Sequence, residues 1–215
     1  MNILVIGATG GSGRAVSDAL LGRGHRVTAV ARHADAIPER PGLTRANGDA
    51  TDSAFLERTI PGHDAVIVTL GISEPALRVR LSGAQGTPGD VRSRGTIAVL
   101  AAARRAAVRR VIVQSSYGVG ETRSLLGVVD RAFFALLIKP QMMDTEMQEA
   151  ALRGSELDWT IVQPVHLSDD ESDDRFVSTD GTIRRRKVSR RGVARVHADL
   201  VEQASMVGRT VSVSG

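Results

Sequence analysis

Short runs of apolar residues alternate with amphipathic stretches along the chain. The apolar runs predict β-strands over residues 2–6, 25–31, 43–47, 65–70, 108–114, 157–162 and 210–213, of which 43–47 is the weakest. The amphipathic stretches predict helices over residues 11–23, 54–59, 91–107, 144–153 and 192–205. Most of the strand runs are continuously apolar, which is typical of parallel strands buried on both faces. The alternation predicts an α/β fold with a doubly wound parallel sheet, formed as a single domain over residues 1–215.

Three segments interrupt this alternation. Residues 72–89 are rich in glycine and proline, residues 118–138 hold a long apolar run, and residues 166–180 hold six acidic side chains. We expect residues 166–180 to be a mobile excursion from the sheet. Ligands of open α/β sheets bind outside the carboxyl ends of the strands, so we expect all three segments to be loops around a substrate pocket. An ordinary helix that buries one face also explains the apolar run within 118–138.

A glycine-rich turn, Gly7-Ala8-Thr9-Gly10-Gly11-Ser12-Gly13, joins the first predicted strand to the first predicted helix. Gly7 permits the tight reversal, Gly10 lets the backbone approach a pyrophosphate, and Gly13 lets the helix pack close to the strand. The N–H groups at the helix start and the helix dipole attract phosphates. The turn therefore predicts a dinucleotide-binding site, which also includes the intervening residues Thr9, Gly11 and Ser12.

Arg32 stands at the end of the second predicted strand. An acidic residue at this place hydrogen-bonds the ribose hydroxyls of NAD, whereas an arginine accommodates the 2′-phosphate of NADP. Arg14, near the start of the first helix, is a candidate for a second cationic contact. These residues predict NADP as the cofactor, with a surface arginine that merely ends a strand as the alternative.

The formal net charge of +4 raises the question of a nucleic-acid partner. The basic residues form one dense cluster, at 184–191, and aromatic residues make up 3% of the chain, too few for base-stacking platforms. A basic patch over an anionic cofactor, or a solvated strand, explains the cluster without nucleic acid. We therefore expect a small-molecule substrate and no nucleic-acid partner, and the oligomeric state is left open.

No apolar run approaches the length that crosses a bilayer, and the first residues lack the pattern of a signal peptide. We therefore expect a cytoplasmic protein without a membrane partner. The chain has no cysteine, which excludes disulfides, thiolate metal ligands and a cysteine nucleophile. Its five histidines are scattered without ligand spacing, so we expect no metal site.

Several short motifs stand at the ends of predicted strands: the turn at 7–13, Gly48-Asp49, Val68-Thr69-Leu70-Gly71, Ser115-Ser116-Tyr117-Gly118, and Leu157-Asp158-Trp159-Thr160-Ile161-Val162-Gln163-Pro164. With these motifs the chain resembles, over nearly its whole length, the atypical short-chain dehydrogenase/reductases. Within that group it is most similar to the flavin reductase/biliverdin-IXβ reductase type and to the NmrA-like proteins. The resemblance implies an NAD(P)-binding Rossmann fold.

The resemblance also implies contacts along the whole cofactor. In order, these are Asp49 and Ala50 at the adenine, Leu70 and Gly71 at the adenosine ribose and the pyrophosphate, Ser115 and Ser116 below the nicotinamide, and Pro164, Val165 and His166 at its carboxamide. Ser116 and Tyr117 are the candidate catalytic residues, which we expect to position the substrate and the nicotinamide. Structural alternatives exist: Asp49 as a helix cap, the serines as an ordinary strand end, and His166 as a structural histidine.

One departure from the family pattern concerns the proton donor. The family's oxidoreductases typically pair a tyrosine with a lysine four residues later, and the lysine lowers the pKa of the phenol. Here Glu121 stands at that spacing from Tyr117, and Thr145 stands where NmrA-like sequences often carry a lysine. A phenol with a pKa of about 10 is a poor proton partner at neutral pH. We therefore do not expect carbonyl reduction by the tyrosine–lysine mechanism.

Some hydride acceptors need little acid–base help from the protein. A flavin, a quinone or a conjugated tetrapyrrole can accept hydride and take its proton from solvent, while the protein orients the reactants. The sequence therefore predicts an NADPH-dependent reductase of such a compound. The alternative is a non-catalytic NADP(H)-binding sensor of the NmrA-like kind, which the missing lysine fits equally. A nucleotide-sugar epimerase or dehydratase is a third hypothesis, although those enzymes normally carry the tyrosine–lysine pair.

Overall fold

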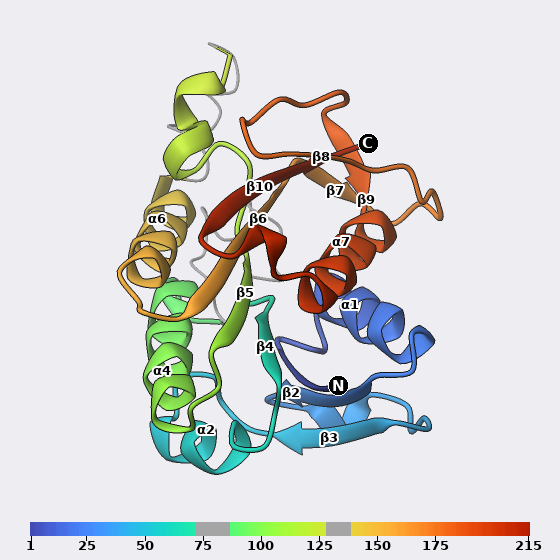
Figure 1. Cartoon of the computed structure of the whole chain (residues 1–215), viewed down its shortest axis with the longest axis vertical. Helices are drawn as coiled ribbons and strands as arrows, with labels where there is room; N and C mark the ends of the chain where they lie inside the picture. Colours follow the sequence, from blue (N-terminus) through green and yellow to red (C-terminus); the bar gives the residue numbers. More distant parts are fainter. Residues whose placement is uncertain (72–86, 128–138) are drawn as a thin grey trace.

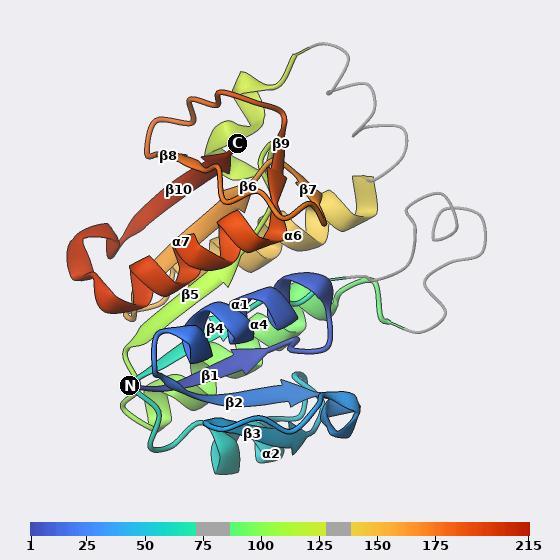
Figure 2. The same ribbon diagram turned by 90° about the vertical axis from the view of Figure 1, so that its right-hand side faces the viewer.

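The computed structural model describes residues 1–71, 87–127 and 139–215 and has a central sheet between two layers of helices (Figures 1 and 2). The strands of the sheet are β1 (Asn2–Ile6), β2 (Arg26–Ala31), β3 (Leu43–Asn47), β4 (Ala65–Val68), β5 (Arg110–Gln114), β6 (Asp158–Pro164), β8 (Phe176–Ser178) and β10 (Arg209–Ser214). Within the described residues their order is β3-β2-β1-β4-β5-β6-β10-β8. The predicted α/β class with a doubly wound sheet is confirmed.

The chain reverses direction across the sheet between β1 and β4. From β1 it builds outward through β2 and β3, and it then returns to place β4 on the other side of β1, with Ile3 registered against both Val27 and Ala65. Such a switch point opens a crevice at the carboxyl ends of the strands. At the far edge, β8 runs antiparallel to β10, so the sheet is mostly rather than entirely parallel.

Helices cover both faces of the sheet (Figure 1). On one face α1 (Gly11–Gly22) packs against α7 (Arg190–Glu202), and on the other α4 (Val91–Arg105) packs against α2 (Ser53–Thr59) and α6 (Lys139–Arg153). Side-chain caps set two of the helix starts, because Asp52 accepts from two N–H groups of α2 and Ser189 accepts from Gly192 in α7. The α7 cap explains why this helix begins two residues earlier than its pattern predicts. Helix α6 begins five residues before the predicted start.

The alternation of side chains along β1 divides the core between the two faces. Ile3 and Val5 belong to the apolar cluster on the α1 and α7 side, whereas Leu4 and Ile6 belong to the cluster on the α2, α4 and α6 side. All four side chains are fully buried. A strand packed on both faces must be apolar at every position, and this is the continuous pattern that the sequence shows.

The expectation that residues 166–180 form an excursion is wrong for two short strands within the segment, and the mobility of the segment stays a prediction. Residues 166–180 contain β8, and they also contain β7 (His166–Ser168), which pairs with β9 (Lys187–Ser189) in a second small sheet. Four acidic side chains of this segment form ion pairs with the basic cluster and with Arg195: Asp169 with Arg190, Asp170 with Lys187, Asp173 with Arg191 and Arg195, and Asp174 with Arg185. The acidic segment and the basic cluster thus neutralise one another.

Much of the other two predicted loops lies outside the described residues, which omit 72–86 and 128–138. The described end of the second loop, 118–127, holds a short 3₁₀ helix over Gly120–Leu125. In the part of the chain that is described, no helix combines the length and apolar character needed to cross a membrane.

Candidate functional site

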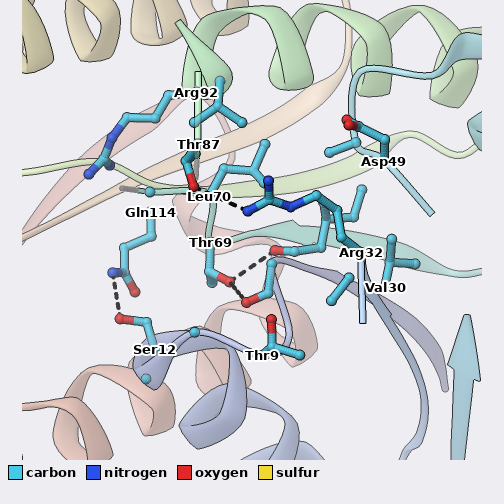
Figure 3. A pocket seen from close by; sticks show the side chains of 18 of the residues that line it. Thr9, Ser12, Val30, Arg32, Asp49, Thr69, Leu70, Thr87, Arg92 and Gln114 are labelled. Carbon is cyan, nitrogen blue, oxygen red and sulfur yellow. Dashed lines mark hydrogen bonds between the residues drawn. The ribbon is translucent and has the colours of Figure 1, made fainter. Parts of the chain in front are cut away.

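A cleft of about 370 Å³ opens at the carboxyl ends of β1, β2, β4 and β5. It lies at the β1–β4 switch point, where open α/β sheets bind their ligands. Ligand pockets in proteins typically measure about 300–1,000 Å³, so the cleft is large enough for a small molecule. Figure 3 shows side chains from both flanks of the switch point directed towards this cleft.

The glycine-rich turn forms one side of the cleft. Gly7 has a φ of +87°, and a Cβ there would lie 2.9 Å from the carbonyl oxygen of Thr69. A Cβ on Gly13 would lie 2.2 Å from the carbonyl oxygen of Gly7, which confirms that α1 packs tightly onto the turn. The hydroxyl of Thr69 donates to the carbonyl oxygen of Ile6 at 2.9 Å, which ties the end of β4 to the turn.

Gly10 and the start of α1 form an anion-binding surface within this turn. Gly10 is the N-cap of α1, no side chain caps the helix, and its first turn contains no acidic residue. The N–H groups at the helix start therefore face the cleft, together with the positive end of the helix dipole. Among the described residues, a Cβ on Gly10 would meet only the carbonyl oxygen of Gly7, at 3.4 Å, so their packing does not require glycine at this position. The bare backbone leaves room for a phosphate to approach.

A buried hydrogen-bond relay orients the hydroxyl of Ser12. The amide Nε2 of Gln114 donates to Ser12 Oγ at 2.9 Å, and the Gln114 Oε1 atom lies 3.3 Å from Nε2 of the fully buried His197. Burial lowers the pKa of His197 to about 3, so the imidazole is neutral at physiological pH and its Nε2–H can donate to Gln114. Because Ser12 accepts from Gln114, its own proton is directed to another acceptor, such as a phosphate oxygen.

Arg32 and Asp49 define the opposite end of the cleft (Figure 3). Arg32 follows β2, and its Nη2 donates to the hydroxyl of Thr87 at 3.1 Å. The carboxylate of Asp49 accepts from both the N–H and the hydroxyl of Thr51, each at 2.8 Å. These hydrogen bonds, the backbone one first, lower the pKa of Asp49, so the carboxylate is ionised. The N-cap of α2 is Asp52 rather than Asp49.

The cleft brings together most of the predicted cofactor contacts and leaves others outside. Those that line it are Gly7, Thr9, Gly10, Gly11, Ser12, Arg32, Asp49, Ala50, Leu70 and Gly71. Gly13 lies beneath the turn, Arg14 is exposed on α1, and Ser115, Pro164, Val165 and His166 are outside the lining, with His166 exposed at the start of β7. The role of these outlying residues in cofactor binding stays a prediction.

The hydroxyls of Ser115 and Tyr117 are engaged within the protein. Ser115 donates to the buried carboxylate of Glu149, which also accepts from Gln163 and from Arg153. Tyr117 donates to the carbonyl oxygen of Gly181 at 3.0 Å. Ser116, like Tyr117, does not line the cleft. Their predicted catalytic roles therefore gain no support from the geometry of the described residues.

Sequence reasoning did not identify several residues that line the cleft: Thr69, Thr87, Arg92, Gln114, Leu167 and Arg190. Gln114 carries a signal that could have found it, because it is the last residue of β5 and so lies at the carboxyl edge of the sheet. Arg190 reaches the cleft from the start of α7, where its side chain lies across Gly11 and pairs with Asp169 at 2.5 Å. Nothing in the local sequence indicates that approach.

The described residues do not bring three or more His, Cys, Asp or Glu side chains together in an arrangement that could hold a metal ion. The polar groups gathered at the switch point are instead those that bind a nucleotide: N–H groups at a helix start, a hydroxyl and arginines.

Comparison with known proteins agrees with this reading. A model of the NAD(P)H-binding family matches residues 7–204 of the chain. The chain is 35% identical over 116 residues to a 3-diazoavenalumate denitrifying reductase from a Streptomyces species, a match that covers 54% of this chain and 38% of that protein. The chain thus spans well under half the length of this curated relative.

Solved structures share the fold. A short-chain dehydrogenase/reductase from Veillonella parvula in complex with NADP has a TM-score of 0.80 and 20% identity, covering 100% of this chain and 94% of that one. ChuY, an anaerobillin reductase from Escherichia coli O157:H7, has a TM-score of 0.77 and 22% identity, covering 100% of this chain and 97% of that one. These likenesses confirm the fold that the resemblance implied. Together with the family match over residues 7–204 and the glycine-lined cleft, they show that the chain belongs to the NAD(P)H-binding family of Rossmann-fold proteins.

Proposed function

We propose that the protein is an NADPH-dependent reductase that transfers hydride to a conjugated small molecule, such as a flavin or a quinone. The observation that carries the proposal is the cleft at the switch point, with the glycine-rich turn on one side and Arg32 at one end. The relatives support it, because the Streptomyces protein and ChuY both carry the names of reductases.

The choice of NADP over NAD rests on Arg32. Its side chain lines the end of the cleft where we expect the adenosine, and its guanidinium donates to the hydroxyl of Thr87. A 2′-phosphate at this end gains a charge-assisted hydrogen bond from the guanidinium. The acid nearest in sequence, Asp49, has its carboxylate engaged by Thr51. The similar Veillonella structure holds NADP.

The residues of the cleft bind and orient the reactants. The N–H groups at the start of α1 and the hydroxyl of Ser12 bind the pyrophosphate, while Leu70 and Gly71 flank the ribose. The bound cofactor supplies the hydride, and the protein contributes alignment and a site with little water. The Gln114–His197 relay keeps the Ser12 hydroxyl directed to the phosphate without carrying a charge of its own.

The hydrogen bonds of Tyr117 and Thr145 favour hydride acceptors that need no proton donor from the protein. Tyr117 directs its hydroxyl to Gly181 rather than into the cleft. The hydroxyl of Thr145, at the position where related sequences often carry lysine, donates to the carbonyl oxygen of Gln141 at 2.8 Å. Glu121 and Thr145 stand at the two positions where related sequences carry a lysine, and neither side chain is a cation that would lower the pKa of a phenol. A flavin or a quinone fits these constraints, because solvent can protonate its reduced form.

A titration with NADPH and NADH tests the cofactor assignment. Arg32→Ala is expected to raise the dissociation constant of NADPH by about tenfold or more, because a hydrogen bond to a charged group is worth about 1.5–3 kcal/mol. Binding of NADH should change little, since it lacks the 2′-phosphate. Arg26→Ala is the matched control, because Arg26 is exposed at the other end of the same strand. An equal loss of NADPH and NADH binding would contradict the assignment.

Turnover with excess FMN, riboflavin and a quinone tests the reaction itself. The missing lysine and the engaged Tyr117 hydroxyl are also compatible with a non-catalytic protein that senses the cofactor. Multiple-turnover oxidation of NADPH by any of these acceptors supports the reductase. Tight NADPH binding without oxidation by any of them would favour the sensor.

A further inference from the structure

The guanidinium of Arg92 lies on the cleft wall beside Gly71, and the cofactor contacts proposed above do not include it. Arg92 is the second residue of α4, and its Nη2 atom is 3.2 Å from the position that a Cβ on Gly71 would occupy. Figure 3 shows its side chain on the same side of the cleft as Gln114, with Asp49 on the opposite side. Arg92 and Asp49 thus lie on opposite sides of the cleft.

This guanidinium has no hydrogen-bond or ion-pair partner among residues 1–71, 87–127 and 139–215. The nearby carboxylate of Asp144 is occupied, because it accepts from the backbone N–H groups of Arg92 and Ser93 and from the Ser93 hydroxyl. Asp144 thus caps α4 from α6, and the guanidinium is the donor that remains. Burial lowers the pKa of Arg92, opposed by the charge of Asp144. An arginine still keeps its proton under these conditions.

A partly buried cation without a partner is costly, and a ligand anion relieves that cost. The other charged side chains of the described cleft are already engaged. Arg190 pairs with Asp169, Asp49 accepts from Thr51, and Arg32 donates to Thr87. The start of α4 does not offer backbone N–H groups to an anion, since Asp144 accepts from them. An anion on this side of the cleft would therefore bind the side chain of Arg92.

We infer that Arg92 binds an oxyanion of the substrate, either a carboxylate or a phosphate, and so selects acidic hydride acceptors. The inference rests on the proposed reductase function, because it takes the Gln114 side of the cleft as the nicotinamide side. The planar guanidinium binds a carboxylate or a phosphate through two parallel hydrogen bonds. An acceptor whose acidic group lies beside Gly71 is within reach of Arg92.

A matched pair of flavins tests this inference. Riboflavin and FMN share one ring system and differ by a single phosphate, and quenching of flavin fluorescence measures the dissociation constant of each. The protein is saturated with NADP⁺ so that neither flavin enters the cofactor site. The wild-type protein is expected to bind FMN about tenfold or more tightly than riboflavin, because of the charge-assisted hydrogen bonds. A naphthoquinone with and without a carboxylate repeats the comparison for the other oxyanion.

Two variants on α4 assign the preference to one side chain. Arg92→Met keeps the length and the apolar stem, and it is expected to bring the ratio of the two flavin dissociation constants close to one. Arg94→Met is the control, because Arg94 is exposed two residues later and pairs with Asp90. It is expected to keep the wild-type ratio. Equal urea midpoints for the two variants confirm that both are folded.

The outcomes separate this inference from the proposed function. The inference is overturned if the ratio of the riboflavin and FMN dissociation constants is the same in the wild type and in Arg92→Met. It is also overturned if Arg92→Met lowers only the affinity for NADPH, which would make Arg92 a cofactor contact. Oxidation of NADPH by a neutral quinone without any FMN preference supports the reductase and overturns the inference. A preference for FMN that depends on Arg92, without oxidation of NADPH, supports the anion site and contradicts the proposed reductase function.

Discussion

Alanine at Gly13 is expected to destabilise the domain by about 2 kcal/mol or more. A Cβ at this position would lie 2.2 Å from the carbonyl oxygen of Gly7 and 2.8 Å from the Cα of Ala8. Both are backbone atoms of the turn, so the clash is relieved only if α1 and the turn move apart. Overpacking of this kind costs about 1–3 kcal/mol, and a backbone clash this close lies at the upper end. Alanine gains about 1 kcal/mol over glycine within a helix, so the clash outweighs the gain.

Alanine at Gly10, three residues earlier, is expected to affect binding instead of folding. Gly10 has a φ of −71° and a ψ of 159°, which alanine adopts readily. Apart from its chain neighbours, the only atom of the described residues within 4 Å of its Cβ position is the carbonyl oxygen of Gly7, at 3.4 Å. The free energy of unfolding should therefore fall by less than about 1 kcal/mol. The methyl group occupies the surface that a pyrophosphate approaches, so NADPH affinity should fall about tenfold or more.

Urea unfolding followed by circular dichroism, with NADPH titration of each variant, separates these two effects. Gly22→Ala is the matched control on α1, because no atom of the described residues outside its own helical turn lies within 4 Å of its Cβ position. It should raise the free energy of unfolding by up to about 1 kcal/mol and leave NADPH affinity unchanged. The reasoning is refuted if Gly10→Ala unfolds as easily as Gly13→Ala, or if it binds NADPH as the wild type does.

Two further predictions concern charge. Arg190→Ala should weaken NADPH binding about tenfold, since the Arg190 side chain lies across Gly11. Asp169→Asn should tighten NADPH binding by up to about fivefold at low salt, because it removes the carboxylate that competes for Arg190. Titrations in which the two variants do not shift NADPH affinity in opposite directions would contradict this. Burial lowers the pKa of His197 to about 3, so below pH 6.5 the unfolded chain takes up a proton that the folded chain does not. As the pH is lowered, the free energy of unfolding should therefore decrease by up to about 1.4 kcal/mol per pH unit. In urea titrations from pH 6.5 to 4.5, His197→Gln should lack this part of the decrease. Equal slopes in the two proteins would refute it.

The parts of the fold that could be predicted from the sequence depend on local patterns. The continuous apolar run of β1 predicts a strand buried on both faces, and the glycines of the turn predict the reversal at Gly7 and the close packing at Gly13. The position of Arg32 could be predicted for the same reason, because it directly follows β2, a strand that the local apolar pattern identifies. In each case the deciding contacts lie within one strand, one turn or one helix.

The features that could not be predicted depend on contacts between distant segments. Strand β8 forms because Val177 pairs with Val213, and the acidic segment is ordered against the basic cluster by pairs such as Asp173 with Arg191. Arg92 and Arg190 reach the cleft only because α4 and α7 begin beside it. Neither residue carries a local signal, since one arginine at the start of a helix looks like any other in the sequence.

The measurement that tests the central claim most directly is steady-state oxidation of NADPH and of NADH by a neutral naphthoquinone, in the wild type and in Arg32→Ala. We expect many turnovers with NADPH in the wild type, a kcat/KM at least about tenfold lower with NADH, and near-equal values for the two cofactors in the variant. Tight NADPH binding with less than one turnover for each protein molecule would contradict this expectation and would leave a protein that binds the cofactor without using it.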